Sequence, residues 1–412
     1  MFARWLQHEL GKSIRKPYVH ILFGARQTGK STIIRSLLGE NTMIVDFSNP
    51  AERSRYLVGP ECLIRECTAL PDKGSPWNVF IDEAQNVPSI FDAVQHLYYG
   101  DKKRWRFIIC GSSARKLRNS GTNLLPGRSM LHHLYPLTLQ EQPFSDRADR
   151  SLSPLQLPSM GTFADKEKFP SWDIVDRLAY GSLPGIVVAD KEDRPNLLRS
   201  YSAIHLEEEI RRETMIRDLS SFARFLAFSA MESGRILNYT SVSNETGVTV
   251  MTIKSYYQIL EDMFIGFSIP AFTGSTRKYL LSTPKFFFFD LGVRNAAAGL
   301  RISGNDVLAN PGPLFEQWVG IELWKMLKYS GDGSLYHYRT KDGAEIDYIL
   351  ETGGELIPIE VKWTERPSPG DARHMLKFIS ENKRSKSGII ICRCPRPMKL
   401  HEKITALPWN CL

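Results

Sequence analysis

The sequence predicts an α/β fold in which a parallel β-sheet is followed by smaller domains. Predominantly apolar runs recur at positions 18–23, 42–47, 77–81 and 106–110, as expected of strands that a parallel sheet buries on both faces. The first run leads into a glycine-rich segment and then into a segment with the apolar spacing of a helix. The 412 residues also exceed the size at which one hydrophobic core stops growing, so we expect several domains.

Composition and charge narrow the possible classes of protein. The 42% of hydrophobic residues is ordinary for a globular protein, and no apolar run approaches the length that spans a bilayer. The first ten residues lack the apolar stretch of a secretory signal, and the six cysteines lack the spacing of a disulfide framework. We therefore expect a cytoplasmic protein with free thiols and no membrane partner. The formal net charge of +8 favours a polyanionic partner such as nucleic acid.

The glycine-rich segment at 24–31 has the pattern G-x-x-x-x-G-K-[ST], in the order strand, loop, helix that this pattern requires. In that geometry, backbone N–H groups and the helix N-terminus surround the phosphates of a nucleoside triphosphate. We expect Lys30 to reach the β and γ oxygens and Ser31 to ligate Mg²⁺. The predicted cofactors are ATP and Mg²⁺, and the predicted nucleotide-binding residues are Gly24, Ala25, Arg26, Gln27, Thr28, Gly29, Lys30, Ser31 and Thr32.

Two acidic residues end the third predicted strand, at 77–83. Asp82 and Glu83 lie at its carboxyl end, which is where ligands bind in open α/β sheets. We expect Asp82 to hold Mg²⁺ through its water shell and Glu83 to polarise the water that attacks the phosphate. Such a pair of acids is common by itself, but its combination with the phosphate loop is specific.

Two serines follow the fourth predicted strand. Ser112 is our candidate for a side chain beside the γ-phosphate, and Ser113 is the next choice. The alternative is that both serines only cap the following helix.

Arg128 lies in a turn before the last strand of this predicted sheet, at 130–134. An arginine there is placed to reach the nucleotide of a neighbouring subunit, where it would stabilise charge on the transferring phosphoryl group. From the residues alone, a surface arginine without a catalytic role is an equal alternative.

These five strands, with an extra strand between the phosphate loop and the acidic pair, resemble the AAA-type ATPases. The chain is also similar to one prokaryotic family of predicted ATPases with a C-terminal domain of unknown function numbered 4143, and the resemblance covers nearly the whole chain. It is carried by Arg26-Gln27, Asp-Glu-Ala-Gln at 82–85, Gly-Ser-Ser-Ala-Arg at 111–115, and Gly127-Arg128 leading to Tyr-Pro-Leu-Thr at 135–138. The resemblance implies an AAA-type core at 1–140, a homo-oligomer in which Arg128 serves a neighbouring subunit, and a restriction-endonuclease-like C-terminal fold.

Residues 141–232 are predicted to form a loop insertion followed by a helical linker. Residues 140–170 are rich in Pro, Ser and Asp and lack periodicity. The segment 178–185 resembles the glycine-proline turn of the family and opens a helical segment from 194 to about 214. The run of alternating charge at 206–213 is expected on a solvated helix face.

Residues 233–292 are predicted to form a winged-helix-like domain. Residues 239–263 indicate helix, glycine turn and helix, with Thr249 capping the second helix. Two strand-like runs within 264–289 would form the wing. DNA binding is one interpretation, although the second helix offers only Lys254 as a base. The other interpretation is that this domain packs against the ATPase core.

Residues 293–412 are predicted to form an α/β domain with a metal site. Asp347 lies in an alternating strand, Glu360 and Lys362 share one face of the next strand, and Glu316 lies on an earlier helix. An acid followed after a hairpin by Glu-x-Lys is typical of restriction-endonuclease-like, or PD-(D/E)xK, nucleases. Asp347 and Glu360, with Glu316, would bind Mg²⁺ while Lys362 orients or activates water. The alternative is that these residues are solvated strand charges.

Three functions remain open from the sequence. The first is an ATPase with a Mg²⁺-dependent nuclease-like domain, in which the nucleotide state controls the engagement of DNA. The second is an ATP-driven DNA motor or branch-point remodeller whose C-terminal domain grips DNA without cleaving it. The third is a nucleotide-dependent switch or scaffold for protein partners.

Overall fold

The computed structural model describes residues 2–113, 125–141, 173–206, 218–273, 283–340 and 343–412. The chain divides into two compact units. The N-terminal unit holds Ala3–Tyr135 and Gln258–Ile265, and the C-terminal unit holds Pro136–Tyr257 and Gly266–Leu412.

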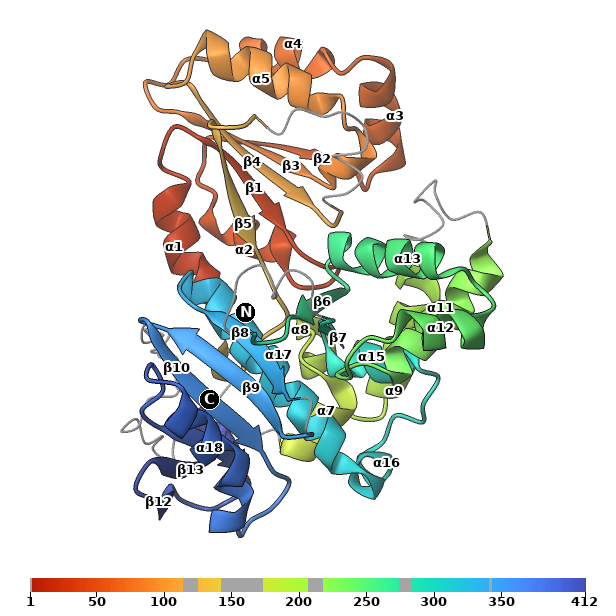
Figure 1. Ribbon diagram of the computed structural model, residues 1–412. Coiled ribbons are helices and arrows are strands. Elements are labelled where there is room, and N and C mark those ends of the chain that lie inside the picture. The colour runs from red at the N-terminus through yellow and green to blue at the C-terminus, as the bar shows by residue number, and fades with distance from the viewer. Residues whose placement is uncertain (1, 114–124, 142–172, 207–217, 274–282, 341–342) are drawn as a thin grey trace. The chain divides into compact units, whose positions relative to one another are not determined.

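The N-terminal unit is built on a five-stranded parallel sheet with the order β2-β3-β4-β1-β5 (Figure 1). This confirms the predicted parallel α/β sheet and each of its predicted strands. The observed strands are β1 (Val19–Phe23), β2 (Thr42–Asp46), β3 (Trp77–Asp82), β4 (Trp105–Gly111) and β5 (Ser129–His133).

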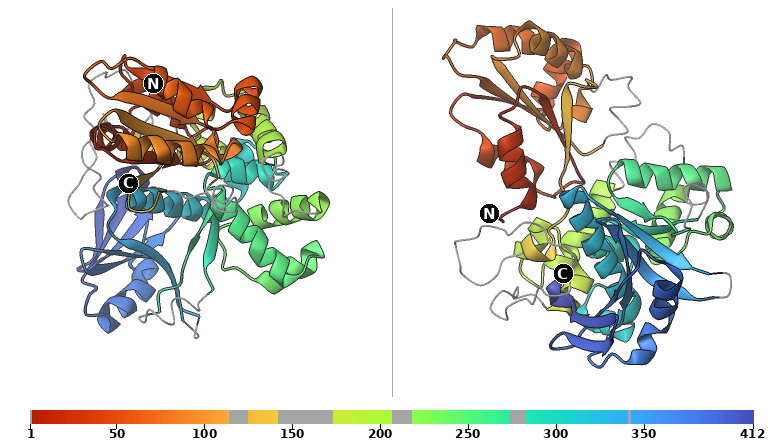
Figure 2. Two further views of the ribbon diagram at one scale, coloured as in Figure 1. Left: turned by 90° about the horizontal axis from the view of Figure 1, so that it is seen from above. Right: turned by 60° about the vertical axis from the view of Figure 1, so that its left-hand side comes forward.

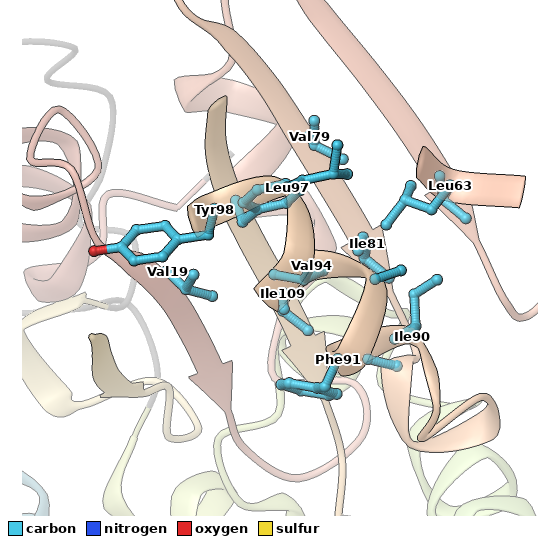
Figure 3. Close-up of a cluster of buried hydrophobic side chains, with 14 of the residues drawn as sticks. Val19, Leu63, Val79, Ile81, Ile90, Phe91, Val94, Leu97, Tyr98 and Ile109 are labelled. Atoms are coloured by element: carbon cyan, nitrogen blue, oxygen red, sulfur yellow. The ribbon is translucent and has the colours of Figure 1, made fainter. Parts of the chain in front are cut away.

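Helices cover both faces of this sheet. They are α1 (Trp5–Ser13), α2 (Lys30–Leu37), α3 (Pro50–Val58), α4 (Cys62–Ala69) and α5 (Ile90–Gly100). Figure 3 shows side chains of α4 and α5, such as Leu63, Phe91 and Val94, packed on Val79 and Ile109 of the central strands. The helices α1 and α2 lie on the other face. Burial on both faces explains why β1 is apolar apart from the buried His20 and has no polar alternation.

The C-terminal unit begins with short helices. They are a 3₁₀ turn (Leu139–Glu141), α7 (Ile174–Tyr180), α8 (Pro184–Val188), α9 (Arg194–Ser200) and a π-helical segment (Tyr201–Leu206) (Figure 2). The predicted glycine-proline turn lies between α7 and α8. Gly181 has a φ of 71°, and a Cβ there would collide with the carboxylate of Asp290, so this position requires glycine. The predicted loop at 142–170 and most of the charged run at 206–213 lie outside the described residues.

The predicted helix, glycine turn and helix are confirmed in the next part of the chain. The elements are α11 (Leu219–Met231), α12 (Tyr239–Thr246) and α13 (Val250–Asp262), followed by an antiparallel pair, β6 (Gly266–Ile269) and β7 (Lys285–Phe288). Gly247 ends α12 in the left-handed conformation, and the Thr249 hydroxyl accepts a hydrogen bond of 3.3 Å from the Thr252 N–H at the start of α13.

A mixed six-stranded sheet, ordered β12-β13-β11-β10-β9-β8, completes the C-terminal unit. Its core joins α18 to the sheet through residues such as Phe378, Ile349 and Ile390. The elements are α15 (Leu291–Ala297), α16 (Gly304–Ala309), α17 (Pro311–Ser330), β8 (Ser334–Arg339), β9 (Glu345–Thr352), β10 (Glu355–Val361), a 3₁₀ turn (Pro369–Ala372), α18 (Arg373–Glu381), β11 (Gly388–Cys392), β12 (Met398–His401), β13 (Ile404–Pro408) and a 3₁₀ turn (Trp409–Cys411).

Candidate nucleotide site and C-terminal carboxylate cluster

The loop between β1 and α2 forms a cradle that its two glycines make possible. A Cβ on Gly24 would collide with the backbone carbonyl of Leu134, so no larger residue fits there. Gly29 has a φ of 96° and precedes Lys30, the first residue of α2. The loop N–H groups therefore meet the N-terminus of α2 at the carboxyl edge of the sheet, as an anion site requires.

Lys30 points its ammonium into this loop. The side chain is 6% exposed, and Nζ donates hydrogen bonds of 2.9 Å to the carbonyl oxygens of Gly24 and Ala25. The Thr28 hydroxyl donates a 2.9 Å bond to the Ala25 carbonyl, which fixes the loop from inside. A cradle closed to Cβ atoms, with a buried ammonium inside it, fits a triphosphate.

Ser31 and Asp82, the two predicted Mg²⁺ ligands of this unit, meet directly. The Ser31 hydroxyl donates a 2.5 Å hydrogen bond to Oδ2 of Asp82, while Oδ1 accepts a 3.0 Å bond from the Glu83 N–H. Burial raises the pKa of Asp82 above its ordinary value, and the Ser31 hydrogen bond opposes that rise. A hydroxyl beside a buried carboxylate is an oxygen donor set that fits Mg²⁺.

Glu83 is held in a strained position beside this pair. Its φ is 54°, which is uncommon for a residue with a Cβ. Its Oε2 accepts a 2.5 Å hydrogen bond from Nε2 of Gln85 and lies 3.9 Å from a guanidinium nitrogen of Arg26. The carboxylate of the predicted water-activating residue is therefore oriented by an amide and a guanidinium.

Gln85 connects Glu83 to Ser112, the predicted γ-phosphate residue. The side chain of Gln85 is 3% exposed. Its Nε2 also donates a 2.9 Å bond to the Ser112 hydroxyl, and its Oε1 accepts a 3.3 Å bond from the Ser112 N–H. Sequence reasoning used Gln85 only as part of a family-like run and gave it no role. The alternative that Ser112 and Ser113 cap a helix concerns residues 114–124, which lie outside the described part of the chain.

The other predicted nucleotide-binding residues lie in the loop and in the first turn of α2. Ala25 is buried, Gln27 has a φ of 61°, and Thr32 is exposed in the first turn of α2.

Sequence reasoning missed Arg4, which is buried beside the loop. Its guanidinium donates a 2.8 Å bond to the Thr28 carbonyl and a 2.6 Å bond to the Tyr135 carbonyl.

Arg128 lies at the end of the strands opposite to the phosphate loop. Its backbone carbonyl accepts a 3.0 Å hydrogen bond from the N–H of Val19, the first residue of β1. Its guanidinium lies 4.8 Å from the centre of the Tyr99 ring. Arg128 is thus at the amino ends of the strands, away from Lys30 and Asp82 at the carboxyl ends, and does not join the site of its own chain.

The C-terminal unit brings Asp347, Glu360 and Lys362 together at adjacent strands. Oδ2 of Asp347 on β9 accepts a 2.8 Å hydrogen bond from the Val361 N–H at the end of β10. The Lys362 ammonium donates a 2.7 Å bond to Oε1 of Glu360. Glu360 is 8% exposed, and its Oε2 is buried without a hydrogen-bond partner.

Lys285, which sequence reasoning missed, reaches the same cluster from β7. It is 4% exposed, and its Nζ lies 3.0 Å from Oε1 of Glu316 and 3.4 Å from Oε1 of Glu345. Burial lowers the pKa of Lys285, but Glu316 and Asp347 outweigh it, so the net shift is upward. Burial, Glu316 and Glu360 raise the pKa of Asp347 well above its ordinary value. The sequence signal that could have marked Lys285 is its position as a lone lysine before a run of four phenylalanines.

The predicted metal set of Asp347, Glu360 and Glu316 is therefore assembled only in part. The donors are hard oxygens that suit Mg²⁺, and the orphaned Oε2 of Glu360 faces no competing donor. Among the described residues, however, no three His, Cys, Asp or Glu side chains converge closely enough to hold a metal ion. Glu316 pairs instead with the buried ammonium of Lys285.

Comparison with protein-family models agrees with this division of sites. An AAA domain model matches residues 16–142, and the model of a domain of unknown function, DUF4143, matches residues 311–412. The chain joins an AAA domain to a DUF4143 domain. A third model, the domain of unknown function DUF8612, matches residues 171–303, and the boundary predicted at 232–233 lies inside this match. The predicted four-domain division itself stays a prediction.

The AAA–DUF4143 chain is similar to proteins of two bacteria. It is 25% identical to an uncharacterized protein of Mycobacterium tuberculosis, over 87% of this chain and 73% of that one. It is 24% identical to an uncharacterized protein of Haemophilus influenzae, over 89% of this chain and 87% of that one. A crystal structure of a Vibrio cholerae protein aligns with 11% identity over 95% and 94% of the two chains, but its TM-score of 0.18 supports no structural inference.

The AAA domain indicates a nucleotide-binding protein, in agreement with the cradle around Lys30. Within the described ranges, no helix has the length and apolar character needed to cross a membrane.

Proposed function

We propose that the chain is a Mg²⁺-dependent ATPase that couples ATP binding and hydrolysis to the engagement of DNA. One observation carries the ATPase part of this proposal, namely the continuous hydrogen-bonded chain from Ser31 through Asp82 to Glu83 and through Gln85 to Ser112. This series of hydrogen bonds joins the donor pair Ser31 and Asp82, the oriented carboxylate of Glu83 and the hydroxyl of Ser112 near the end of the phosphate loop.

Each side chain of this network has a distinct proposed role. The Lys30 ammonium exchanges the carbonyl oxygens of Gly24 and Ala25 for phosphate oxygens of ATP, and the Ser112 hydroxyl lies beside the γ-phosphate. Glu83 accepts a hydrogen bond from the attacking water and polarises it. Ser31 and Asp82 would hold Mg²⁺, which stabilises the negative charge of the transferring phosphoryl group when it is bound.

Arg128 is proposed to act on a neighbouring copy in a homo-oligomer. Its place at the amino ends of the strands supports this role, because the phosphate loop of the same chain lies at the carboxyl ends. Mixing Arg128→Ala with Lys30→Ala subunits should restore part of the ATP turnover. Turnover that does not depend on protein concentration, with no restoration on mixing, would contradict an active site shared between subunits.

The restriction-endonuclease-like fold is proposed for the DUF4143 domain from its element order. A helix, an antiparallel meander of three strands, a second helix and a parallel strand follow one another as α17, β8, β9, β10, α18 and β11. Asp347 lies on the second strand of the meander, and Glu360 lies on the third, next to Lys362. Together with the net charge of +8, this arrangement supports DNA as the partner.

Lys285 favours a second candidate function, in which the C-terminal domain grips DNA without cleaving it. The ammonium of Lys285 pairs with Glu316, the residue predicted to complete a metal shell. Cleavage by a metal ion would require this pair to open. A DNA motor or branch-point remodeller would need no such rearrangement.

The α11–α13 segment with the β6–β7 pair is proposed as the winged-helix-like part. The helix α13 is not suited to reading a DNA groove, because the ammonium of its Lys254 lies 5.4 Å from the centre of the Tyr239 ring on α12. The last residues of α13 belong to the N-terminal unit, where Phe264 packs on Phe23 and His133. These contacts favour packing over DNA reading for this helix.

One set of reactions distinguishes the candidate functions. Labelled duplex, forked and four-way-junction DNA would be incubated with Mg²⁺, with and without ATP, and with the wild type, Lys30→Ala and Lys362→Ala. Cleavage that is lost only in Lys362→Ala supports a nuclease, and strand displacement that is lost only in Lys30→Ala supports a motor. Absence of any effect on all three DNAs would contradict both and leave the nucleotide-dependent switch or scaffold.

A further inference from the structure

The N-terminal unit contains a pocket of about 550 Å³ at the amino ends of the strands, opposite to the phosphate loop. It is lined by α1, the C-terminal end of α2 and the first residues of β3 and β4. Asn78 and Arg106 are the second residues of β3 and β4, at the amino ends of these strands. Lys30 and Asp82 lie at the carboxyl ends, so this pocket is separate from the nucleotide site.

Among the described residues, the lining of the pocket includes three cationic side chains and no acidic one. Lys12 lies on α1 with His8, Arg15 lies in the turn after this helix, and Arg106 comes from β4. His8 and Lys12 have the i, i+4 spacing of one face of α1. No acidic side chain in the described ranges forms an ion pair with Lys12, Arg15 or Arg106. The positive charges of Lys12, Arg15 and Arg106 therefore meet at one pocket, where an external anion would balance them.

Gly11 keeps the floor of the pocket open. It lies inside α1, where glycine is less favourable than alanine. Packing does not demand it, because a Cβ at this position would meet Leu37 at an ordinary contact distance of 3.4 Å. The glycine, next to Ile14 and Leu37, therefore leaves a shallow apolar floor between the cations.

We infer that this pocket binds the phosphate groups of a nucleic-acid strand, with Lys12, Arg15 and Arg106 as the phosphate contacts. Lys12 lies in the last turn of α1, Arg15 lies in the turn after that helix, and Arg106 lies on β4, so the three cations come from separate elements around one pocket. Three separate cations suit the successive phosphates of a backbone, while the apolar floor suits a sugar or base. The inference rests on the proposed function in taking DNA as the partner, and it adds a contact outside the DUF4143 domain.

The test is binding of a fluorescent single-stranded DNA oligonucleotide to the full chain, measured by anisotropy over a range of salt concentrations. The variant Lys12→Ala/Arg15→Ala/Arg106→Ala should bind about tenfold or more weakly. The slope of log K against log salt should fall by about two in magnitude, since each lost phosphate contact contributes about 0.7. Gly11→Leu should also weaken binding, because it fills the floor and keeps every charge.

The matched control removes three other cations of the same unit, as Arg53→Ala/Lys102→Ala/Lys103→Ala, and should change affinity less than twofold. ATP binding by every variant checks that the unit folds. Pocket variants that bind DNA like the wild type would overturn this inference and leave the proposed DNA function standing. A wild type that binds no DNA would overturn both. Equal weakening by the control would show a general charge effect and would also overturn the pocket.

Discussion

The nucleotide site and the C-terminal carboxylate cluster differ in what balances their charges. The Lys30 ammonium is held by two neutral carbonyl oxygens, and Asp82 is held by a hydroxyl. In the C-terminal cluster, Glu316 pairs with the ammonium of Lys285, and Glu360 pairs with that of Lys362. Separating a buried charge from an opposite charge costs more than exchanging a neutral hydrogen-bond partner. On the proposed function, the site around Lys30 would therefore take its ligand by exchanging neutral partners, while a metal ion in the C-terminal cluster would first have to open an ion pair.

The largest expected effect concerns the oriented carboxylate of the AAA site. Glu83→Gln should still bind ATP, because the cradle around Lys30 is unchanged. Its rate of ATP hydrolysis should fall about 10²-fold or more, since the amide cannot act as a general base. Steady-state turnover, together with binding of a fluorescent ATP analogue, measures both quantities. Fast hydrolysis by this variant would show that another residue activates the water.

The next effect concerns the lysine that closes the C-terminal site. Lys285→Met leaves Glu316 and Asp347 without their cation and should destabilise the unit by about 2 kcal/mol. This is less than the 3–5 kcal/mol of a fully buried pair, because the Glu316 side chain is 27% exposed. Mg²⁺ should then raise the melting temperature of the variant more than that of the wild type.

The double variant Lys285→Met/Glu316→Gln is the control for Lys285→Met. It removes the uncompensated carboxylate and should regain part of the lost stability. An Mg²⁺ effect equal in the wild type and Lys285→Met would contradict the view that Lys285 occupies the place of a cation.

A smaller effect is expected for the amide that links Glu83 to Ser112. Gln85→Leu should lower kcat about tenfold, or about 1.4 kcal/mol, because Glu83 loses its orienting hydrogen bond. The KM for ATP should change little, since Gln85 does not contact the phosphate loop. Gln85→Glu keeps the shape of the side chain but removes the amide N–H donors, so it tests the same link. A change confined to KM would show that Gln85 does not position Glu83.

The smallest effect is a pH dependence of stability in the C-terminal cluster. Because the pKa of Asp347 is raised in the folded chain, the folded state binds a proton that the unfolded state releases. The free energy of unfolding should therefore rise as the pH falls from the raised pKa towards about 4, the unfolded value. Asp347→Asn should remove this dependence and raise the melting temperature at neutral pH by about 2–4 °C, the shift of about 1 kcal/mol. Parallel melting curves for variant and wild type at every pH would contradict the assignment.

The conformation of the loop before α2 could be predicted from the sequence because its residues are local. Gly24, Gly29, Lys30 and Ser31 lie within one loop, and the backbone conformation of that loop explains the pattern. Asp82 was predictable because parallel strands end at one edge. The partners that sequence reasoning missed, Arg4, Gln85 and Lys285, act across tertiary contacts, and no local pattern marks such contacts.

The same distinction explains the C-terminal cluster. Asp347, Glu360 and Lys362 follow from strand periodicity, and the structure brings them together. The pairing of Glu316 depends on where β7 places Lys285, which is a matter of tertiary arrangement. Predicting a metal ligand from residue type alone therefore overlooked a competing cation.

ATP hydrolysis by the full chain, with and without Mg²⁺, tests the central claim most directly when the wild type is compared with Lys30→Ala. The account predicts Mg²⁺-dependent phosphate release by the wild type and a loss of about 10²–10³-fold in Lys30→Ala, as expected when a preorganised charge contact to the transition state is removed. The exposed Arg35, in the last turn of the same helix, provides the control Arg35→Ala, which should keep wild-type turnover. Equal turnover by the wild type and Lys30→Ala, or turnover without Mg²⁺, would contradict the account.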